Sequence, residues 1–397
     1  MAIKEEVARI IEEVRKNGDR AIGYYLRKFD GLNLQPENLK IDVTRMSVRV
    51  SQNFRRAVKT AIARVKRFHQ LEKARITNWQ ENIGGIIVGQ IFRPVERVAV
   101  YVPGGIYPYP STIVMGVIPA QVAGVKELVL ATPPKNIVPE ILYTAKICGI
   151  KTIYPIGGPV AIAALAIGTK NVRRVDMIVG PGNAYVTEAK RQLFGEVGID
   201  GLAGPSEVAI LVLGRVKKLV VDYVVADLLA QAEHSPDARS YLLTDDRKFA
   251  AEVRQKLSAG FDRRANYQII CSSRQEAIRR VNELAPEHLQ IIASGWKQIL
   301  ARIKNAGAIF IGELTPTALG DYLAGPSHIL PTGGAARFSG GLSVRTFLRQ
   351  TSIIQVKSPV KKIYQTAGEL ARAEKMFYHK KSLIQRTGES NESTAKD

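Results

Sequence analysis

Gln231 and His234 lie three residues apart in a segment that is typical of a helix, and Ser235-Pro236 would end that helix. Residues three apart share one helix face, so an amide oxygen and an imidazole nitrogen could reach the same metal ion. Taken alone, such a pair is more often incidental than functional. We therefore treat both as candidate ligands whose partners must come from elsewhere in the chain.

Glu287 and His288 form a dipeptide directly before an apolar run that predicts a strand. The two side chains have different ordinary pKa values, so one could remove a proton from an alcohol while the other activates water. The alternative is a solvated pair in a loop. This dipeptide is the candidate for general acid–base chemistry.

Two further histidines lie in contrasting segments. His328 belongs to residues 320–334, a stretch rich in glycine and proline that predicts a shaped loop rather than a regular element and also contains Asp321. His379 lies in residues 373–381, which are typical of a basic helix. Gln, His, Asp and His side chains offer nitrogen and oxygen ligands without cysteine. This mixture suits zinc, and manganese or cobalt could replace it.

The composition limits the classes of protein to which the chain can belong. Its 397 residues are 46% hydrophobic and 23% charged, values typical of a globular protein with two or three domains. No apolar run is long enough for a membrane span, and the Glu-rich N-terminus does not resemble a signal peptide. Two cysteines, Cys148 and Cys271, exclude a disulfide scaffold and favour a reducing, cytoplasmic location.

The net charge of +21 would attract anions, nucleic acid among them. The basic residues are spread over the whole chain, however, and no basic tail or aromatic-interleaved RNA signature is present. We therefore expect a small-molecule substrate, with no nucleic-acid partner and no membrane partner. A basic nucleic-acid-binding protein built on an enzyme scaffold is the alternative from another class.

Hydrophobic periodicity predicts alternating helices and strands. Helices are expected over residues 3–28 and 51–69, and later at about 112–124, 137–148 and 159–167. Between and after them, apolar runs predict strands at residues 98–102, 127–131, 152–156, 176–179, 207–213, 241–244, 267–271, 289–293 and 308–311. A spacing near 25 residues is typical of repeated βαβ units, which indicate parallel sheets with right-handed crossovers.

These elements predict an α/β fold with two Rossmann-like domains. One domain is expected to cover residues 101–207, and a discontinuous second one to combine residues 1–100 with 208–342. A small, mostly helical C-terminal region (343–386) and a polar, disordered tail (387–397) would follow. Glycine-rich turns follow several strands, but none matches the dinucleotide fingerprint G-x-G-x-x-G.

The motifs, in their order, resemble the histidinol dehydrogenase family over residues 4 to about 386. They are VYVPGG at 100–105, GPGNAYVTEAKRQ at 180–192, AGPSEV at 203–208, LLAQAEHSPDA at 228–238, APEHLQI at 285–291 and GDYLAGPSHILPT at 320–332. The resemblance implies an NAD- and zinc-dependent homodimer. Two positions depart from the family pattern: Val160 replaces a glutamine that contacts the nucleotide, and Ser327 replaces an asparagine.

The resemblance also implies roles for individual residues. Gln231, His234 and Asp321 match zinc ligands, and His379 matches a fourth ligand supplied by the other subunit. Glu287 and His288 match the catalytic pair, and Tyr101 and Asn183 match NAD contacts. The implied substrate contacts are Ser206, His328 and Glu374, together with Gln231, His234, His288, Asp321 and His379.

The implied reaction is the last step of histidine biosynthesis, a four-electron oxidation of L-histidinol through L-histidinaldehyde to L-histidine. His288 would act as the general base towards the hydroxyl, and Glu287 would activate the water that attacks the aldehyde. The alternative within the enzymes is a paralogous zinc-dependent NAD alcohol dehydrogenase that acts on another polar hydroxylated substrate. His328 and Glu374 would suit an imidazole and amine substrate, which favours the first interpretation.

Overall fold

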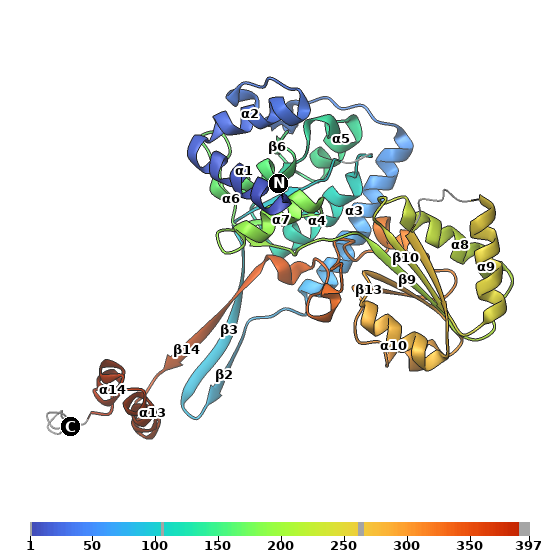
Figure 1. Ribbon diagram of the computed structural model, residues 1–397. Helices are drawn as coiled ribbons and strands as arrows, with labels where there is room; N and C mark the ends of the chain where they lie inside the picture. The colour runs from blue at the N-terminus through green and yellow to red at the C-terminus, as the bar shows by residue number, and fades with distance from the viewer. Residues whose placement is uncertain (1, 105–106, 261–265, 389–397) are drawn as a thin grey trace. The chain divides into compact units, whose positions relative to one another are not determined.

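The computed structural model of the chain describes residues 2–104, 107–260 and 266–388. The chain divides into two compact units, the first formed by Met1–Lys73 with Pro94–Phe347 and the second by Ala74–Arg93 with Leu348–Asp397 (Figure 1). Most of the predicted tail, residues 389–397, and Gly105 of the VYVPGG motif lie outside the described residues.

The described residues of the first unit form two sheets, and the first of these has the strand order β1-β6-β5-β4-β7-β8. Its strands are β1 (Ile41–Asp42), β4 (Arg97–Tyr101), β5 (Glu127–Ala131), β6 (Thr152–Tyr154), β7 (Met177–Val179) and β8 (Gly198–Ile199). Only β1, at one edge, pairs antiparallel; the other pairs are parallel. Because β5 and β6 continue on one side of β4 while β7 and β8 lie on the other, the strand order reverses between β4 and β7. In doubly wound sheets, ligands bind at the carboxyl ends of the strands at such a reversal.

Helices cover this sheet, and the N-terminal helices belong to it. They are α1 (Ile3–Asn17), α2 (Asp19–Asp30), α3 (Gln52–Lys73), α4 (Pro110–Ala123), α5 (Pro139–Ile147), α6 (Gly158–Ile167) and α7 (Ala184–Leu193). The buried faces of α1 and α2 share one core with α6 and with Ala99 and Tyr101 of β4. The predicted single helix over 3–28 is interrupted because Gly18 adopts a positive φ of 51°, a conformation that ends α1.

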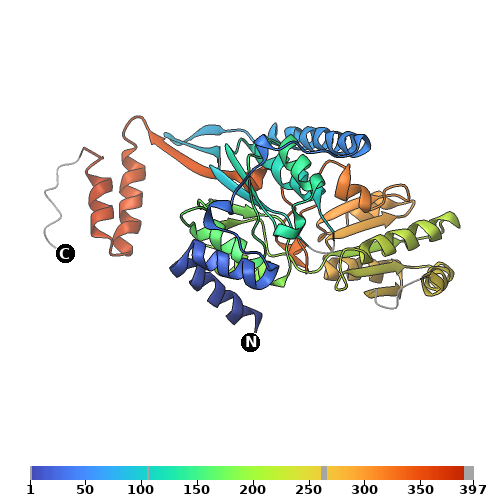
Figure 2. The ribbon, with the colours of Figure 1, turned by 90° about the horizontal axis from the view of Figure 1, so that it is seen from above.

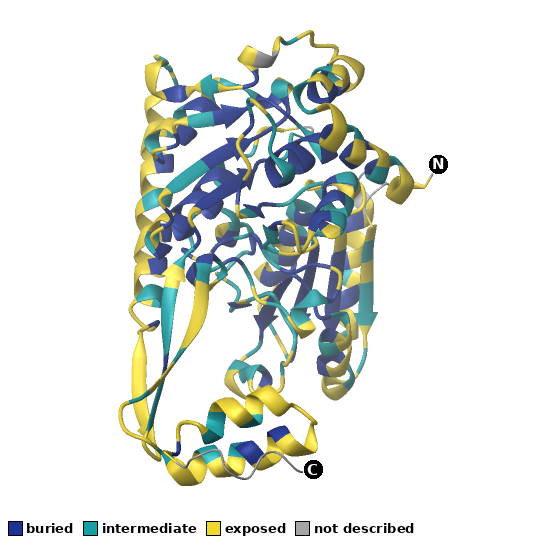
Figure 3. Cartoon of the chain, turned by 90° about the vertical axis from the view of Figure 1, so that its left-hand side faces the viewer, coloured by how far each residue is buried: buried dark blue, intermediate teal, exposed yellow. Residues whose placement is uncertain are grey.

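The second sheet has the order β11-β10-β9-β12-β13, and all its strands are parallel. Its strands are β9 (Glu207–Val212), β10 (Arg239–Thr244), β11 (Asn266–Cys271), β12 (His288–Ile292) and β13 (Ala308–Ile311). The accompanying helices are α8 (Leu219–Ala232), α9 (Arg247–Gly260), α10 (Arg274–Leu284), α11 (Trp296–Leu300) and α12 (Ala318–Tyr322). Short 3-10 turns occupy Pro36–Asn38, Val43–Arg45, Pro134–Asn136, Ala335–Arg337 and Val344–Phe347. Figure 3 shows that the strands of these sheets are largely buried, whereas the outer helix faces are exposed.

Up to residue 388, the second unit holds a three-stranded sheet of order β14-β3-β2 and two helices. The elements are β2 (Trp79–Ile83), β3 (Ile86–Pro94), β14 (Leu348–Val356), α13 (Lys361–Ala373) and α14 (Phe377–Ile384). The two helices lie side by side (Figure 2). The prediction of a mostly helical C-terminal region missed this sheet, because β14 pairs with a strand more than 250 residues earlier in the chain.

The α/β fold and its parallel sheets agree with the prediction, but the domain boundaries differ. Residues 1–100 do not complete the second sheet; α1 and α2 pack on the first sheet instead, and residues 74–93 belong to the second unit. Amphipathic helices carry no sequence signal for the sheet that they will cover, since any apolar face can accept them. Among the described residues, no helix has both the length and the apolar character needed to span a bilayer.

Candidate functional site

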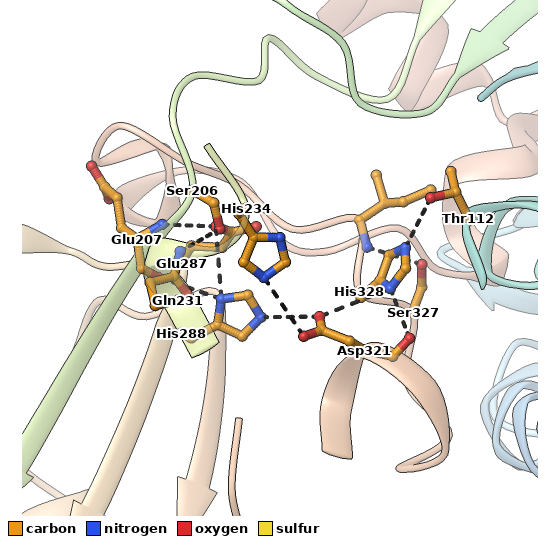
Figure 4. A network of polar contacts seen from close by, with 11 residues as sticks. Thr112, Ser206, Glu207, Gln231, His234, Glu287, His288, Asp321, Ser327 and His328 are labelled. Carbon is orange, nitrogen blue, oxygen red and sulfur yellow. Dashed lines mark hydrogen bonds and ion pairs between the residues drawn. The ribbon is translucent and has the colours of Figure 1, made fainter. Parts of the chain in front are cut away.

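The described part of the first unit has two lobes, one built around each of its sheets. Side chains of the second lobe gather at the amino edge of the second sheet, and Thr112 of α4 approaches them from the first lobe (Figure 4). Glu287 directly precedes β12, His288 is the first residue of that strand, and Ser206 directly precedes β9. Because β9 and β12 are paired neighbours in the sheet, their first residues lie close together. The cluster therefore lies at the opposite edge from the carboxyl ends at which doubly wound sheets usually bind ligands.

Glu287 is buried, and its carboxylate is held by two donors. Its Oε2 accepts a hydrogen bond of 2.5 Å from the Ser206 hydroxyl and one of 3.0 Å from the Glu207 backbone N–H. Burial raises the pKa of Glu287 to about 7, although these two hydrogen bonds act in the opposite direction. A carboxyl group with such a pKa can both accept and return a proton near neutral pH.

His288 is also buried, and its two ring nitrogens face different groups. Nδ1 lies 3.4 Å from the backbone carbonyl oxygen of Glu207, and Nε2 lies 3.9 Å from Oδ1 of Asp321. Burial lowers the pKa of His288, so the neutral ring is favoured. With the proton on Nδ1, shared with the carbonyl, Nε2 is left with a free lone pair and can act as a base.

Gln231 and His234 come from the end of α8 and the turn that follows it, as the sequence predicted. The amide Nε2 of Gln231 donates a 2.9 Å hydrogen bond to Ser206 Oγ, which orients the amide and leaves its Oε1 as a lone-pair donor. Nε2 of His234 lies 3.9 Å from Oδ2 of Asp321. The structure thus brings both residues into the cluster that contains Glu287 and His288.

Asp321 stands between three imidazole rings. Its carboxylate lies 3.9 Å from nitrogens of His234, His288 and His328, and burial raises its pKa to about 6. Residues 320–334 were predicted as a shaped loop, but Asp321 lies on the short helix α12. Gly320 lets this helix approach Phe310, because a Cβ there would meet the Phe310 ring at 2.6 Å.

His328 lies in the loop after α12 and links the two lobes of the unit. Its Nδ1 hydrogen-bonds to the backbone carbonyl of Asp321 at 2.9 Å, and its Nε2 lies 3.4 Å from the Thr112 hydroxyl on α4. Burial lowers the pKa of His328 to about 4, so the ring is neutral at physiological pH. The neighbouring Ser327 donates to the backbone carbonyl of Met115, also on α4, at 3.1 Å.

The donor chemistry of Gln231, His234 and Asp321 fits a zinc ion. Two ligands that each bind one ion at about 2.1 Å stand roughly 3–4 Å apart, which is the range of the 3.9 Å separation between His234 and Asp321. The described residues contain no group of three or more His, Cys, Asp or Glu side chains arranged as a complete metal site. The proposed ligand set includes the amide of Gln231, which is not one of these four residue types. The metal assignment therefore stays a prediction.

Tyr101 and Asn183 lie at the carboxyl edge of the first sheet, where the strand order reverses. Tyr101 ends β4, and its buried hydroxyl accepts a 3.0 Å hydrogen bond from the N–H of Gly158, the first residue of α6. Asn183 caps α7 by accepting from the N–H groups of Tyr185 and Val186. Two helices thus begin at this edge, and the positive ends of their dipoles favour a negatively charged group such as a phosphate. Val160 is buried in the core of the sheet.

Glu374 and His379 belong to the second unit, where both are exposed. Glu374 directly follows α13, and His379 lies on α14. Their contribution to the site stays a prediction.

Sequence reasoning missed several residues that shape the cluster. Thr112 reaches His328 from 216 positions away, and the backbone of Glu207 serves both Glu287 and His288. Neither has a sequence signal, because the first contact is non-local and the second uses backbone atoms that every residue carries. Asp227, one turn before Gln231 on α8, is a buried carboxyl whose pKa is raised by burial and lowered in part by Gln290 of β12.

Asp227→Asn is expected to stabilise the fold at alkaline pH. Burial raises the pKa of Asp227 from 3.8 to about 6, so its contribution to stability is full below pH 4 and is lost as the pH rises through 6. The neutral amide avoids this loss, worth about 1–3 kcal/mol at pH 8. Thermal unfolding of the wild type and the variant at pH 4.5 and pH 8 measures this difference in stability. The exposed Asp222→Asn on the same helix should show no such pH-dependent gain, and an equal gain there would contradict the assignment.

Comparisons with known proteins cover nearly the whole chain. The family model described as histidinol dehydrogenase matches residues 1–387. The histidinol dehydrogenase of Oceanobacillus iheyensis is 41% identical over 400 residues, covering 96% of this chain and 92% of the relative. The histidinol dehydrogenase of Carboxydothermus hydrogenoformans is 42% identical over 372 residues, covering 89% of this chain and 86% of the relative.

Solved structures give the same result. The crystal structure of histidinol dehydrogenase from Elizabethkingia anophelis superimposes with a TM-score of 0.88 at 33% identity, covering 98% of this chain and 93% of that one. A putative aldehyde dehydrogenase from Burkholderia cenocepacia shares only the fold. It is 12% identical with a TM-score of 0.54, and the match covers 89% of this chain and 86% of that one. The chain therefore belongs to the histidinol dehydrogenase family.

Proposed function

We propose that the chain oxidises L-histidinol with NAD, through L-histidinaldehyde, to L-histidine. The observation that carries this proposal is the buried pair Glu287 and His288, in which each group faces different partners. One is a carboxyl with a pKa near 7 and the other an imidazole kept neutral by burial. Two proton-transfer groups suit a reaction that first oxidises an alcohol and then a hydrated aldehyde.

His288 serves as the base for the alcohol. The Glu207 carbonyl favours the tautomer with the proton on Nδ1, so Nε2 is free to take the hydroxyl proton as the hydride leaves the adjacent carbon. Bound NAD would supply the acceptor for that hydride. The imidazolium that forms at His288 is stabilised by the carboxylate of Asp321, 3.9 Å from Nε2.

Glu287 serves as the base for water. Its carboxylate takes a proton from the water that attacks the aldehyde, while the Ser206 hydroxyl and the Glu207 N–H hold it in one orientation. Burial of the pair excludes bulk water, which limits escape of a reactive aldehyde.

Gln231, His234, Asp321 and His379 would hold zinc. The ion would supply a binding point for the amino and imidazole nitrogens of the substrate and so would orient it. Ser206, His328 and Glu374 complete the substrate contacts, and Tyr101 and Asn183 contact NAD at the reversal between β4 and β7. Val160 is buried in the sheet core, and a valine side chain has no donor or acceptor that could replace the amide of the family glutamine.

The chain functions as a homodimer in which α14 of each subunit supplies His379 to the other. Phe377 and Tyr378, next to His379 on that helix, are 55% and 77% exposed, and Ile354 and Leu370 of the same unit are 74% and 66% exposed. Large apolar side chains gathered in one small unit are typical of a surface that another protein covers. A second copy of the chain fits the proposed shared site.

His379→Ala is expected to lower bound zinc well below one ion per subunit, because the site loses one of four ligands. Mixing this variant with Asp321→Ala should restore about a quarter to a half of the sites, since hybrid dimers regain one intact set. Metal analysis and activity of the mixed dimers check this. A lack of recovery would show that His379 acts within its own subunit or not at all.

The function is tested by counting NADH formed per L-histidinol consumed, with and without a chelator. The expected result is two NADH per substrate and a loss of activity on zinc removal that added zinc restores. One NADH per substrate, or turnover only of another polar alcohol, would support a paralogous zinc-dependent dehydrogenase instead. A salt-sensitive nucleic-acid complex that survives zinc removal, without turnover, would contradict both.

A further inference from the structure

Lys190 and Asp200 form a buried ion pair in the first sheet's lobe. Nζ of Lys190 lies 2.6 Å from Oδ1 of Asp200, and the two side chains are only 3% and 7% exposed. Lysine and aspartate are rarely buried unless they are paired, because each charge must be compensated in the low-dielectric interior. The pair plays no part in the proposed chemistry.

The same two side chains hold both polar groups of a single residue, Gly180. The Gly180 N–H donates to Oδ2 of Asp200 at 2.6 Å, and Nζ of Lys190 donates to the Gly180 carbonyl, also at 2.6 Å. Gly180 has a φ of 114°, and a Cβ there would meet the backbone oxygen of Tyr101 at 2.1 Å. The ion pair therefore clamps a backbone segment that packs directly against the end of β4.

Gly180 begins the turn that leads from β7 to Asn183, the cap of α7. This turn lies at the reversal of strand order between β4 and β7, where a doubly wound sheet binds its ligand. Backbone N–H groups bind a pyrophosphate more tightly where the turn is already held in the bound conformation. A charged clamp on both sides of Gly180 restricts the turn to one conformation.

The segment after Asp200 leads directly to the catalytic cluster. The Thr187 hydroxyl of α7 donates to the Ala203 carbonyl at 2.7 Å, and the Gly204 N–H donates to the Thr332 hydroxyl. Ser206, which binds Glu287, follows two residues later. Asp200 is thus attached at one end to the turn at β7 and, through six residues of chain, to the group that orients the catalytic carboxyl.

We propose that Lys190 and Asp200 are positioning residues that hold the 180–183 turn in its dinucleotide-binding conformation and in register with the catalytic cluster. This inference rests on the proposed use of NAD. It assigns the pair to cofactor affinity, whereas a purely structural pair would affect only the stability of the fold.

The test uses Lys190→Met and Asp200→Asn, with Arg191→Met as the matched control. Arg191 lies next to Lys190 on α7, and its ion pair with Glu188 is exposed. NAD binding is measured by titration calorimetry, the KM for NAD and for L-histidinol by kinetics, and bound zinc by metal analysis. Hydrogen exchange of residues 180–186 reports the conformation of the turn.

We expect both variants to weaken NAD binding about tenfold or more, with faster exchange at 180–186. The KM for L-histidinol and the zinc content should stay within about twofold of wild type, since the metal and substrate contacts are unchanged. The control should behave like wild type. Folded variants with unchanged NAD affinity would overturn the inference, whereas a wild-type chain that binds no NAD would overturn the proposed function.

Lys190→Arg keeps the proposal testable if the neutral variants do not fold. It retains the positive charge but changes the position of the side-chain N–H group that donates to the Gly180 carbonyl. An intermediate loss of NAD affinity is expected. In the wild-type chain, NAD should slow exchange at both 180–186 and 200–204, the two segments that the clamp joins. Protection confined to other segments would contradict the assignment.

Discussion

His288→Asn is expected to lower kcat for L-histidinol oxidation by about 10²–10⁴-fold, the range associated with loss of a positioned general base. Asparagine offers no group that accepts a proton near neutral pH, although it can still donate to the Glu207 carbonyl that now faces Nδ1. Since His288 is outside the proposed ligand set, zinc content and NAD affinity should be preserved. Steady-state kinetics, metal analysis and calorimetry on one preparation measure the three quantities.

His69→Asn is the matched control for this change. His69 is equally buried, on α3, where its Nδ1 lies 2.8 Å from the carboxylate of Glu72. Its replacement is expected to lower the melting temperature without a comparable effect on kcat. Turnover that survives in His288→Asn would remove His288 as the base, and loss of zinc from that variant would place it among the metal ligands instead.

Glu287→Gln is expected to separate the two oxidations. The amide oxygen can still accept from Ser206 and from the Glu207 N–H, so the local structure should persist. It cannot take a proton from water, however, so oxidation of L-histidinaldehyde should fall by about 10²–10⁴-fold. Oxidation of L-histidinol should fall much less, because His288 handles that proton. The measured ratio of NADH to L-histidinol should drop from two towards one as the aldehyde accumulates.

Glu207→Gln is the matched control, since it makes the same chemical change at the adjacent buried carboxyl. The hydrogen bonds of Glu207 to Glu287 and His288 use its backbone atoms, and its side chain pairs with Arg239. We expect this variant to keep the two-to-one ratio of NADH to substrate. Equal losses of both oxidations in Glu287→Gln would argue against separate roles for the two groups.

Local patterns predicted most of the regular elements correctly. The apolar runs at residues 127–131 and 308–311 are strands β5 and β13 with the predicted bounds, and His288 begins the strand expected next to it. The predicted elements were wrong where a single residue ends a helix or where a strand forms only by pairing with a distant segment. Gly18 divides the predicted N-terminal helix, and β14 exists as a strand because it pairs with β3 far earlier in the chain.

The candidate site divides in the same way. The types and spacing of the residues made Glu287, His288, Gln231, His234 and Asp321 candidates, and the family resemblance assigned their roles. The sequence did not indicate that they meet at the amino edge of the second sheet, while the predicted nucleotide contacts lie at the carboxyl edge of the first. The contacts of Thr112 with His328 and of Lys190 and Asp200 with Gly180 were also invisible.

The sequence alone therefore determined three things: the order of helices and strands, the residue types able to move protons or bind a metal, and the family resemblance. Periodicity and motif spacing are local properties that the chain displays before it folds. The tertiary structure decided which helices cover which sheet. It also decided the raised pKa of Glu287, the lowered pKa of His288 and the contacts of Lys190 and Asp200 with Gly180. Each of these depends on burial and on contacts between residues distant in sequence, and packing alone creates them.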